Sequence, residues 1–112
     1  MLDGIYTITF RGAANWGMGA LVLYKGTIAG ADVGGALYDG QYTDQGDSVL
    51  VNMVMKVPPG VTLVQGTAPR ATAYEVPFSV VINKKSFENS EPVLLKLPPG
   101  PVNVIFKRLR TI

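Results

Sequence analysis

The sequence contains no cysteine and no histidine. Without cysteine, the chain has no disulfide bond, thiolate metal ligand or cysteine nucleophile, so its stability has to come from a packed interior. Without histidine, it lacks the usual general base, the commonest metal ligand and the side chain that titrates near neutral pH. These two absences exclude histidine-dependent catalytic triads. We therefore expect a protein that is not an enzyme and that carries no cofactor and no metal ion.

Charge and long apolar runs are also scarce. Ten Lys and Arg residues oppose eight Asp and Glu residues, and charged residues make up 16% of the chain, against about 25% in an average domain. A net charge of +2 is too weak to indicate direct nucleic-acid binding. The longest apolar run, residues 17–24, falls short of the roughly 20 residues of a spanning helix, and no basic, apolar leader follows Met1. We expect a cytoplasmic protein without membrane contact.

Short segments of alternating apolar and polar residues are abundant, and this period of two is typical of strands with one buried face. Residues 5–11 and 48–57 show it most clearly, and a chain of 112 residues has room for one domain, residues 1–112. The pattern predicts a small antiparallel β-domain, either a barrel or a sandwich. Its predicted core comprises Tyr6, Ile8, Phe10, Val51, Met53, Phe78, Val80 and Ile82.

Glycine and proline divide the chain into about eight predicted strands, because these residues favour turns and interrupt strand ladders. The polar residues 84–91 have room for one helical turn, and Gly40 indicates a bulge or a close approach of two backbones. The predicted strand segments are residues 5–11, 17–24, 27–29 with a short continuation, 36–43, 48–57 with a shorter continuation at 61–64, 75–83, 93–97 and 102–109.

Two of these strands carry apolar residues on both faces. Residues 17–24 begin with small side chains, which predicts either a cover on both sides or a tight bend at a barrel corner. Residues 48–57 place Leu50 and Val54 on the face opposite the predicted core. We expect a homodimer that buries Leu50 or Val54 between two subunits.

Methionine gives the sequence its one indication of a ligand. Met53 and Met55 lie on the inward face of residues 48–57, where flexible thioethers can shape an adaptable cavity. Trp16, Met18 and Phe78 complete this candidate cavity. The patterns favour an interior filled by side chains over a ligand cavity, and they favour a Trp16 that seals one end of the barrel over a Trp16 that stacks on a ligand.

The first forty-odd residues resemble a known family. They combine an Asp3-Gly4-Ile5-Tyr6 start, a small-residue strand that reaches Lys25-Gly26, a Gly30-x-Asp32 step and a Tyr38-x-Gly40 step. This arrangement is similar to the GrlR family, negative regulators of type III secretion in enteric bacteria. The resemblance implies an all-β fold, namely a small antiparallel, eight-stranded, up-and-down β-barrel of lipocalin type. It also implies a cytoplasmic dimer that regulates transcription by binding another protein.

The resemblance places the partner contact in one turn. An acidic surface motif of the family matches Asp44, Gln45, Gly46 and Asp47, which keep two acidic residues of four. The implied partner is a DNA-binding transcriptional activator. The alternative function is a lipocalin-type carrier of a small apolar ligand, such as a fatty acid, inside the barrel.

Overall fold

The computed structural model describes residues 2–112. In this part of the chain, segments of alternating apolar and polar residues form eight antiparallel strands, and there is one short helix. The helix is the single turn predicted within residues 84–91. In chain order the elements are β1 (Gly4–Arg11), β2 (Trp16–Tyr24), β3 (Thr27–Asp32), β4 (Leu37–Asp44), β5 (Ser48–Val57), β6 (Tyr74–Asn83), α1 (Lys84–Glu88), β7 (Val93–Leu97) and β8 (Gly100–Thr111).

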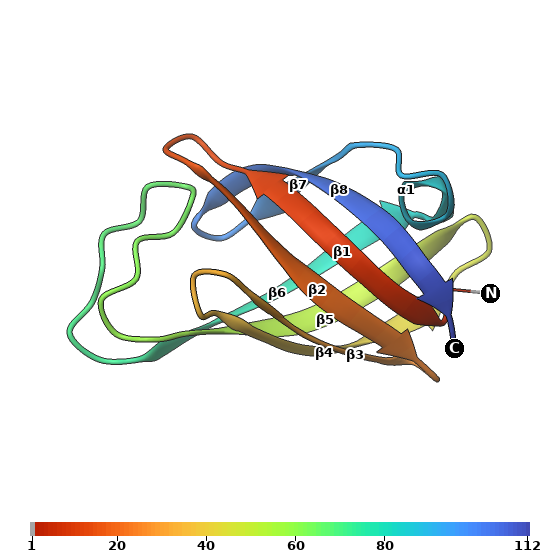
Figure 1. Cartoon of the computed structure of the whole chain (residues 1–112), viewed down its shortest axis with the longest axis horizontal. Coiled ribbons are helices and arrows are strands. Elements are labelled where there is room, and N and C mark those ends of the chain that lie inside the picture. The colour runs from red at the N-terminus through yellow and green to blue at the C-terminus, as the bar shows by residue number, and fades with distance from the viewer. Residues whose placement is uncertain (1) are drawn as a thin grey trace.

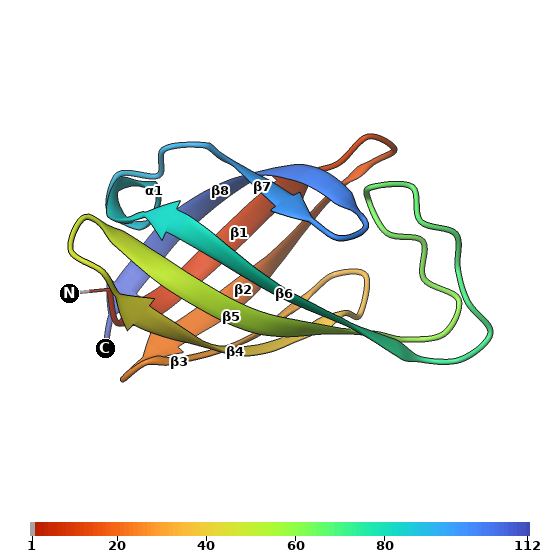
Figure 2. The ribbon, with the colours of Figure 1, turned by 180° about the vertical axis from the view of Figure 1, so that it is seen from behind.

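The strands form one sheet that curls into a nearly closed barrel (Figure 1). Their order is β6-β5-β4-β3-β2-β1-β8-β7, so β8 pairs with β1 and the first six strands form a continuous meander. The two ends of this order, β6 and β7, lie against one another and bring the barrel close to closure (Figure 2). The predicted all-β, eight-stranded, up-and-down barrel is confirmed, and its architecture is consistent with the lipocalin type.

Inward residues of the strands form the main core. Five of the eight predicted core residues are buried in one cluster, whereas Phe10, Phe78 and Val80 are only partly buried against it. These three side chains point inward but also line an internal cavity, as shown below. The predicted faces of β1, β5 and β6 are therefore correct, while the expected complete burial is wrong for these three residues.

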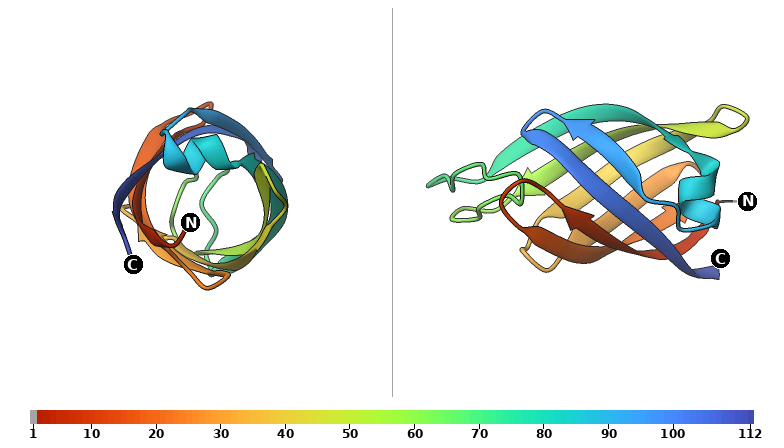
Figure 3. Two further views of the ribbon diagram at one scale, coloured as in Figure 1. Left: turned by 90° about the vertical axis from the view of Figure 1, so that its right-hand side faces the viewer. Right: turned by 90° about the horizontal axis from the view of Figure 1, so that it is seen from above.

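One end of the barrel is closed by α1, which lies over it in the axial view (Figure 3). Asn83 caps the helix by accepting a hydrogen bond from the backbone N–H of Lys85. The helix inserts Phe87, which is 2% exposed, against the rings of Tyr6 and Phe106 at centroid distances of 5.7 and 4.5 Å. These three aromatic rings stabilise the closed end.

The long connection between β5 and β6 lies at the opposite end of the barrel (Figure 2). A strand was expected at residues 61–64, but these residues form no ladder, because the connection makes its own turns. The N–H of Gly66 donates to the carbonyl of Leu63, and the N–H of Leu63 donates to the carbonyl of Thr67. Leu63 then packs in a second apolar cluster with Ala36, Met55, Val57 and Val76.

A buried carboxylate ties the start of the chain to the closed end. Asp3 is 8% exposed and accepts a hydrogen bond from the hydroxyl of Tyr42 on β4. It also accepts one from the backbone N–H of Lys25, at 3.2 Å, in the turn between β2 and β3. Lys25 has a φ of 48°, a conformation that most residues adopt only when the surroundings hold it. Asp3 therefore connects three separate segments.

This carboxylate makes stability depend on pH in a defined direction. The hydrogen bond from Tyr42, followed by that from Lys25, lowers the pKa of Asp3 below its ordinary value of 3.8. A group whose pKa is lowered by folding stabilises the folded chain above its unfolded pKa, and that contribution is lost as pH falls through the folded pKa. We expect Asp3→Asn to be less stable than the unmodified chain at about pH 6, and this disadvantage to be smaller at about pH 3, below the unfolded pKa.

Urea unfolding at the two pH values measures this effect. Asp39→Asn, which changes an exposed carboxylate on β4, is the matched control and should show no such pH dependence. An Asp3→Asn variant that is equally destabilised at both pH values would contradict the assignment.

Candidate functional site

The barrel encloses an apolar cavity of about 480 Å³. Its mouth lies among the turns at the end opposite α1, where Trp16, Val33 and Gln65 line it, and its floor reaches Ile82 and Phe87. A volume in this range is typical of small-molecule sites, which measure roughly 300 to 1,000 Å³. The interior was expected to be filled by side chains, and that expectation is wrong.

Glycines at inward positions explain why the interior is not filled. Gly19, Gly30 and Gly40 lie on the inward faces of β2, β3 and β4, where they contribute no side chain. A Cβ atom at any of them would lie 2.2 to 2.3 Å from a carbonyl oxygen of the neighbouring strand. The strands therefore approach too closely at these positions for any other residue. The close approach predicted at Gly40 is confirmed, whereas the cover or bend predicted for residues 17–24 stays a prediction.

A hydrogen-bonded pair provides the polar group of the cavity wall near the mouth. Oδ2 of Asp32 accepts a hydrogen bond of 2.5 Å from the hydroxyl of Tyr38. Oδ1 of Asp32 accepts hydrogen bonds from the backbone N–H groups of Gly34 and Ala36, at 2.9 and 3.1 Å. Burial, reinforced by the hydrogen bond to Asp32, strongly raises the pKa of Tyr38. The Tyr38 hydroxyl therefore stays protonated and keeps donating to the carboxylate.

The connection between β5 and β6 forms part of the mouth. The carbonyl of Val64 accepts hydrogen bonds from the backbone N–H groups of Ala14 and Asn15, at 2.9 and 3.1 Å. Gly12 permits this contact, because a Cβ there would lie 2.5 Å from the same carbonyl oxygen. The connection and the β1–β2 turn are thus held together beside the cavity.

Four of the five residues predicted for a cavity line it, namely Trp16, Met53, Met55 and Phe78. Met18 does not, because it occupies an outward position of β2 and is 43% exposed. Trp16 is 57% exposed at the mouth and does not seal the barrel, which is the role of Phe87 at the other end.

Sequence reasoning missed Asp32 and Tyr38 as cavity residues. The Gly30-x-Asp32 and Tyr38-x-Gly40 steps supported only the resemblance to the GrlR family. A spacing of two places both members of each step on the same face of a strand. Because Gly30 and Gly40 point inward, Asp32 and Tyr38 do so as well. This alternation was the signal that could have found them.

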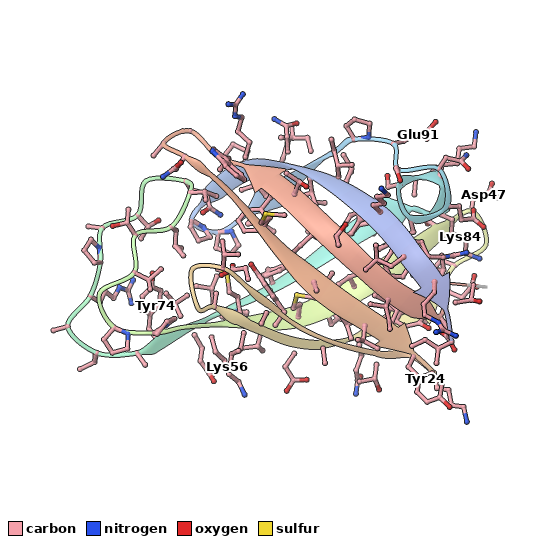
Figure 4. The ribbon with its side chains drawn as sticks, viewed as in Figure 1. Tyr24, Asp47, Lys56, Tyr74, Lys84 and Glu91 are labelled. Atoms are coloured by element: carbon pink, nitrogen blue, oxygen red, sulfur yellow. The ribbon has the colours of Figure 1, made fainter. Side chains whose placement is uncertain are left out.

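The predicted partner-binding turn, residues 44–47, is exposed at the closed end of the barrel. Its first carboxylate is already paired, because Asp44 accepts two hydrogen bonds from Nζ of Lys84 at 2.7 and 2.8 Å and one from the N–H of Gly46. The contact with Lys84 is the main reason that the pKa of Asp44 is lowered. Figure 4 shows Lys84 and Asp47 at this end, far from Tyr74 beside the long connection. Asp47 keeps an exposed side chain.

The outer face predicted to form a dimer is partly covered within the chain. Leu50 and Val54 are half-buried on the outward face of β5. Leu50 lies opposite Val81 of β6, which is 60% exposed. No partner chain is present, so the homodimer stays a prediction.

No protein-family model and no curated protein matches the chain. The resemblance to the GrlR family therefore rests on the residues quoted for it. Within residues 2–112, no helix has the length and apolarity needed to cross a membrane. In the same part of the chain, no three acidic residues lie close enough to hold a metal ion.

Two phenylalanines on the cavity wall should differ in their contribution to stability. Phe87 is fully packed, so Phe87→Ala should cost about 3 to 5 kcal/mol of unfolding free energy. Phe78 borders empty space and is only half-buried, so Phe78→Ala should cost roughly 1 to 2 kcal/mol. Denaturant unfolding of both variants measures the difference. If the Phe78→Ala change costs as much as the other, the side chain is fully packed in solution and the cavity does not persist there.

Proposed function

We propose that this chain binds a small, predominantly apolar molecule inside its barrel and has no catalytic activity. The observation that carries the proposal is the apolar cavity that runs through the described part of the barrel from the mouth to Phe87. An unfilled apolar cavity forfeits dispersion contacts that its lining atoms would otherwise make. A ligand of matching shape restores those contacts, so its binding stabilises the folded chain.

The construction of the two ends supports a binding role. The closed end is packed with the rings of Phe87, Tyr6 and Phe106, whereas the mouth is lined by turns and by the exposed ring of Trp16. A ligand that enters at the mouth meets apolar side chains along the interior and polar groups only near the entrance. Binding sites for apolar molecules generally combine an apolar wall with a few polar groups that orient the ligand.

A second proposal is regulation through protein contact in the cytoplasm, as the resemblance to the GrlR family implies. Its support is the outward apolar surface made by Leu50, Val54 and Val81 together with the exposed turn at residues 44–47. Because Asp44 is paired with Lys84, the turn offers a partner such as a DNA-binding activator chiefly the carboxylate of Asp47. The two proposals are compatible, since the cavity and this surface lie on different sides of the sheet.

Filling the cavity should abolish ligand binding. Val80 points inward beside the cavity, so we expect Val80→Phe to occupy ligand space, whereas Val81→Phe on the next, outward residue should not. The neutral fluorescent probe N-phenyl-1-naphthylamine measures binding, and saturation at about 100 times its Kd should stabilise the unmodified chain by about 2.7 kcal/mol. Native mass spectrometry of protein purified from its source cells should also detect retained ligand mass. Absence of probe binding to the unmodified chain would refute the proposal.

If the outward face of β5 forms a homodimer interface, a charged side chain on that face should dissociate the dimer. We expect the unmodified chain to sediment as a dimer at tens of micromolar and Val54→Lys to sediment as a monomer. Ile105→Lys, on the outward face of β8, is the control and should leave the dimer intact. A monomeric unmodified chain at that concentration would remove the homodimer and leave ligand binding unaffected.

A further inference from the structure

The charges around the cavity are unbalanced. Among the described residues that line it, none is Lys or Arg, and Asp32 supplies the only carboxylate. A charged group inside an apolar site is strongly disfavoured unless an opposite charge or hydrogen-bond donors compensate for its lost hydration. The wall therefore offers an opposite charge to a cation but none to an anion.

From this imbalance we infer that the cavity selects neutral or cationic amphiphiles and rejects anionic ones such as fatty acids. The inference rests on the proposed function, because it concerns the charge of the ligand in the same cavity. It replaces the fatty acid named among the expected ligands by a molecule with an apolar body and a hydroxyl, amide or amine head group. The head group would lie near the mouth, beside Asp32 and Tyr38.

The hydrogen bonds of Asp32 and Tyr38 explain the selection. A barrel without a cation can still bind an anion through hydroxyl groups that donate hydrogen bonds. The Tyr38 hydroxyl, however, already donates its hydrogen bond to Asp32. An ionised carboxylate has about four acceptor sites, and three of those on Asp32 are used. One remains, and it can accept a hydrogen bond from a ligand hydroxyl, amide or ammonium group.

Other cations do not provide a counter-charge inside the cavity. Arg11 is exposed and takes an outward position at the end of β1. Arg70 lies over the ring of Tyr74 at 4.0 Å from its centroid, in the long connection outside the cavity. Lys56 is exposed on the outward face of β5. The remaining polar side chains of the mouth, Asn15, Thr62 and Gln65, are uncharged and suit a neutral head group.

Two fluorescent probes with the same ring system test the inference on the unmodified chain. N-phenyl-1-naphthylamine is neutral, and 1-anilinonaphthalene-8-sulfonate adds a single anionic group. We expect the sulfonate to bind at least about tenfold more weakly, because it meets Asp32 and no cation. In displacement of the neutral probe, dodecylamine and dodecanol should compete well and dodecanoate should compete poorly. Equal binding of the two probes, or equal competition by dodecanoate and dodecanol, would overturn the inference.

The Asp32→Asn variant tests whether the carboxylate of Asp32 causes the charge selection. It should bind the sulfonate at least about threefold more tightly than the unmodified chain, so that the ratio of neutral-probe affinity to sulfonate affinity falls. Asp39→Asn, on the outward face of β4, is the matched control and should change neither affinity. A folded Asp32→Asn variant with unchanged selectivity would refute the role of Asp32. Failure of both probes to bind the unmodified chain would refute the proposed function itself, whereas binding of both with equal affinity would refute only the charge selection.

Discussion

The close approach of neighbouring strands at Gly19, Gly30 and Gly40 is the constraint on which the rest of this barrel depends. Each glycine lies so near a carbonyl oxygen of the next strand that a Cβ atom has no room. The same three positions point inward, where larger side chains would otherwise fill the barrel. One feature of the backbone thus accounts both for the close strand approaches in β2, β3 and β4 and for part of the space of the cavity.

The two ends of the barrel divide stability and binding between them. At the closed end, α1 inserts Phe87 between aromatic rings, and Asp3 joins the start of the chain to β4 and to the β2–β3 turn. At the open end, turns line the mouth, and the connection between β5 and β6 is held to the β1–β2 turn through the carbonyl of Val64. Substitutions at the closed end are therefore expected mainly to lower the free energy of unfolding, and substitutions at the mouth mainly to change ligand affinity.

The pair formed by Asp32 and Tyr38 links the fold to the proposed ligand. Asp32 accepts two backbone hydrogen bonds in the β3–β4 turn, so it has a structural role whether or not a ligand is present. Its position on the cavity wall gives that structural carboxylate a second consequence, because it sets the sign of the charge inside an apolar site. A turn that the fold requires can in this way determine which molecules the cavity accepts.

The sequence by itself determined the all-β class, the inward faces of β1, β5 and β6, the short helix and the close approach at Gly40. These features depend on alternation, turn residues and small side chains, which act over a few neighbouring positions. The same alternation places Asp32 and Tyr38 on inward faces, together with Gly30 and Gly40. Only the tertiary structure decided that residues 61–64 form part of a connection, that Met18 points outward and that Phe87 rather than Trp16 closes the barrel. It alone decided that the interior holds a cavity, because packing density depends on how residues distant in sequence meet across the barrel.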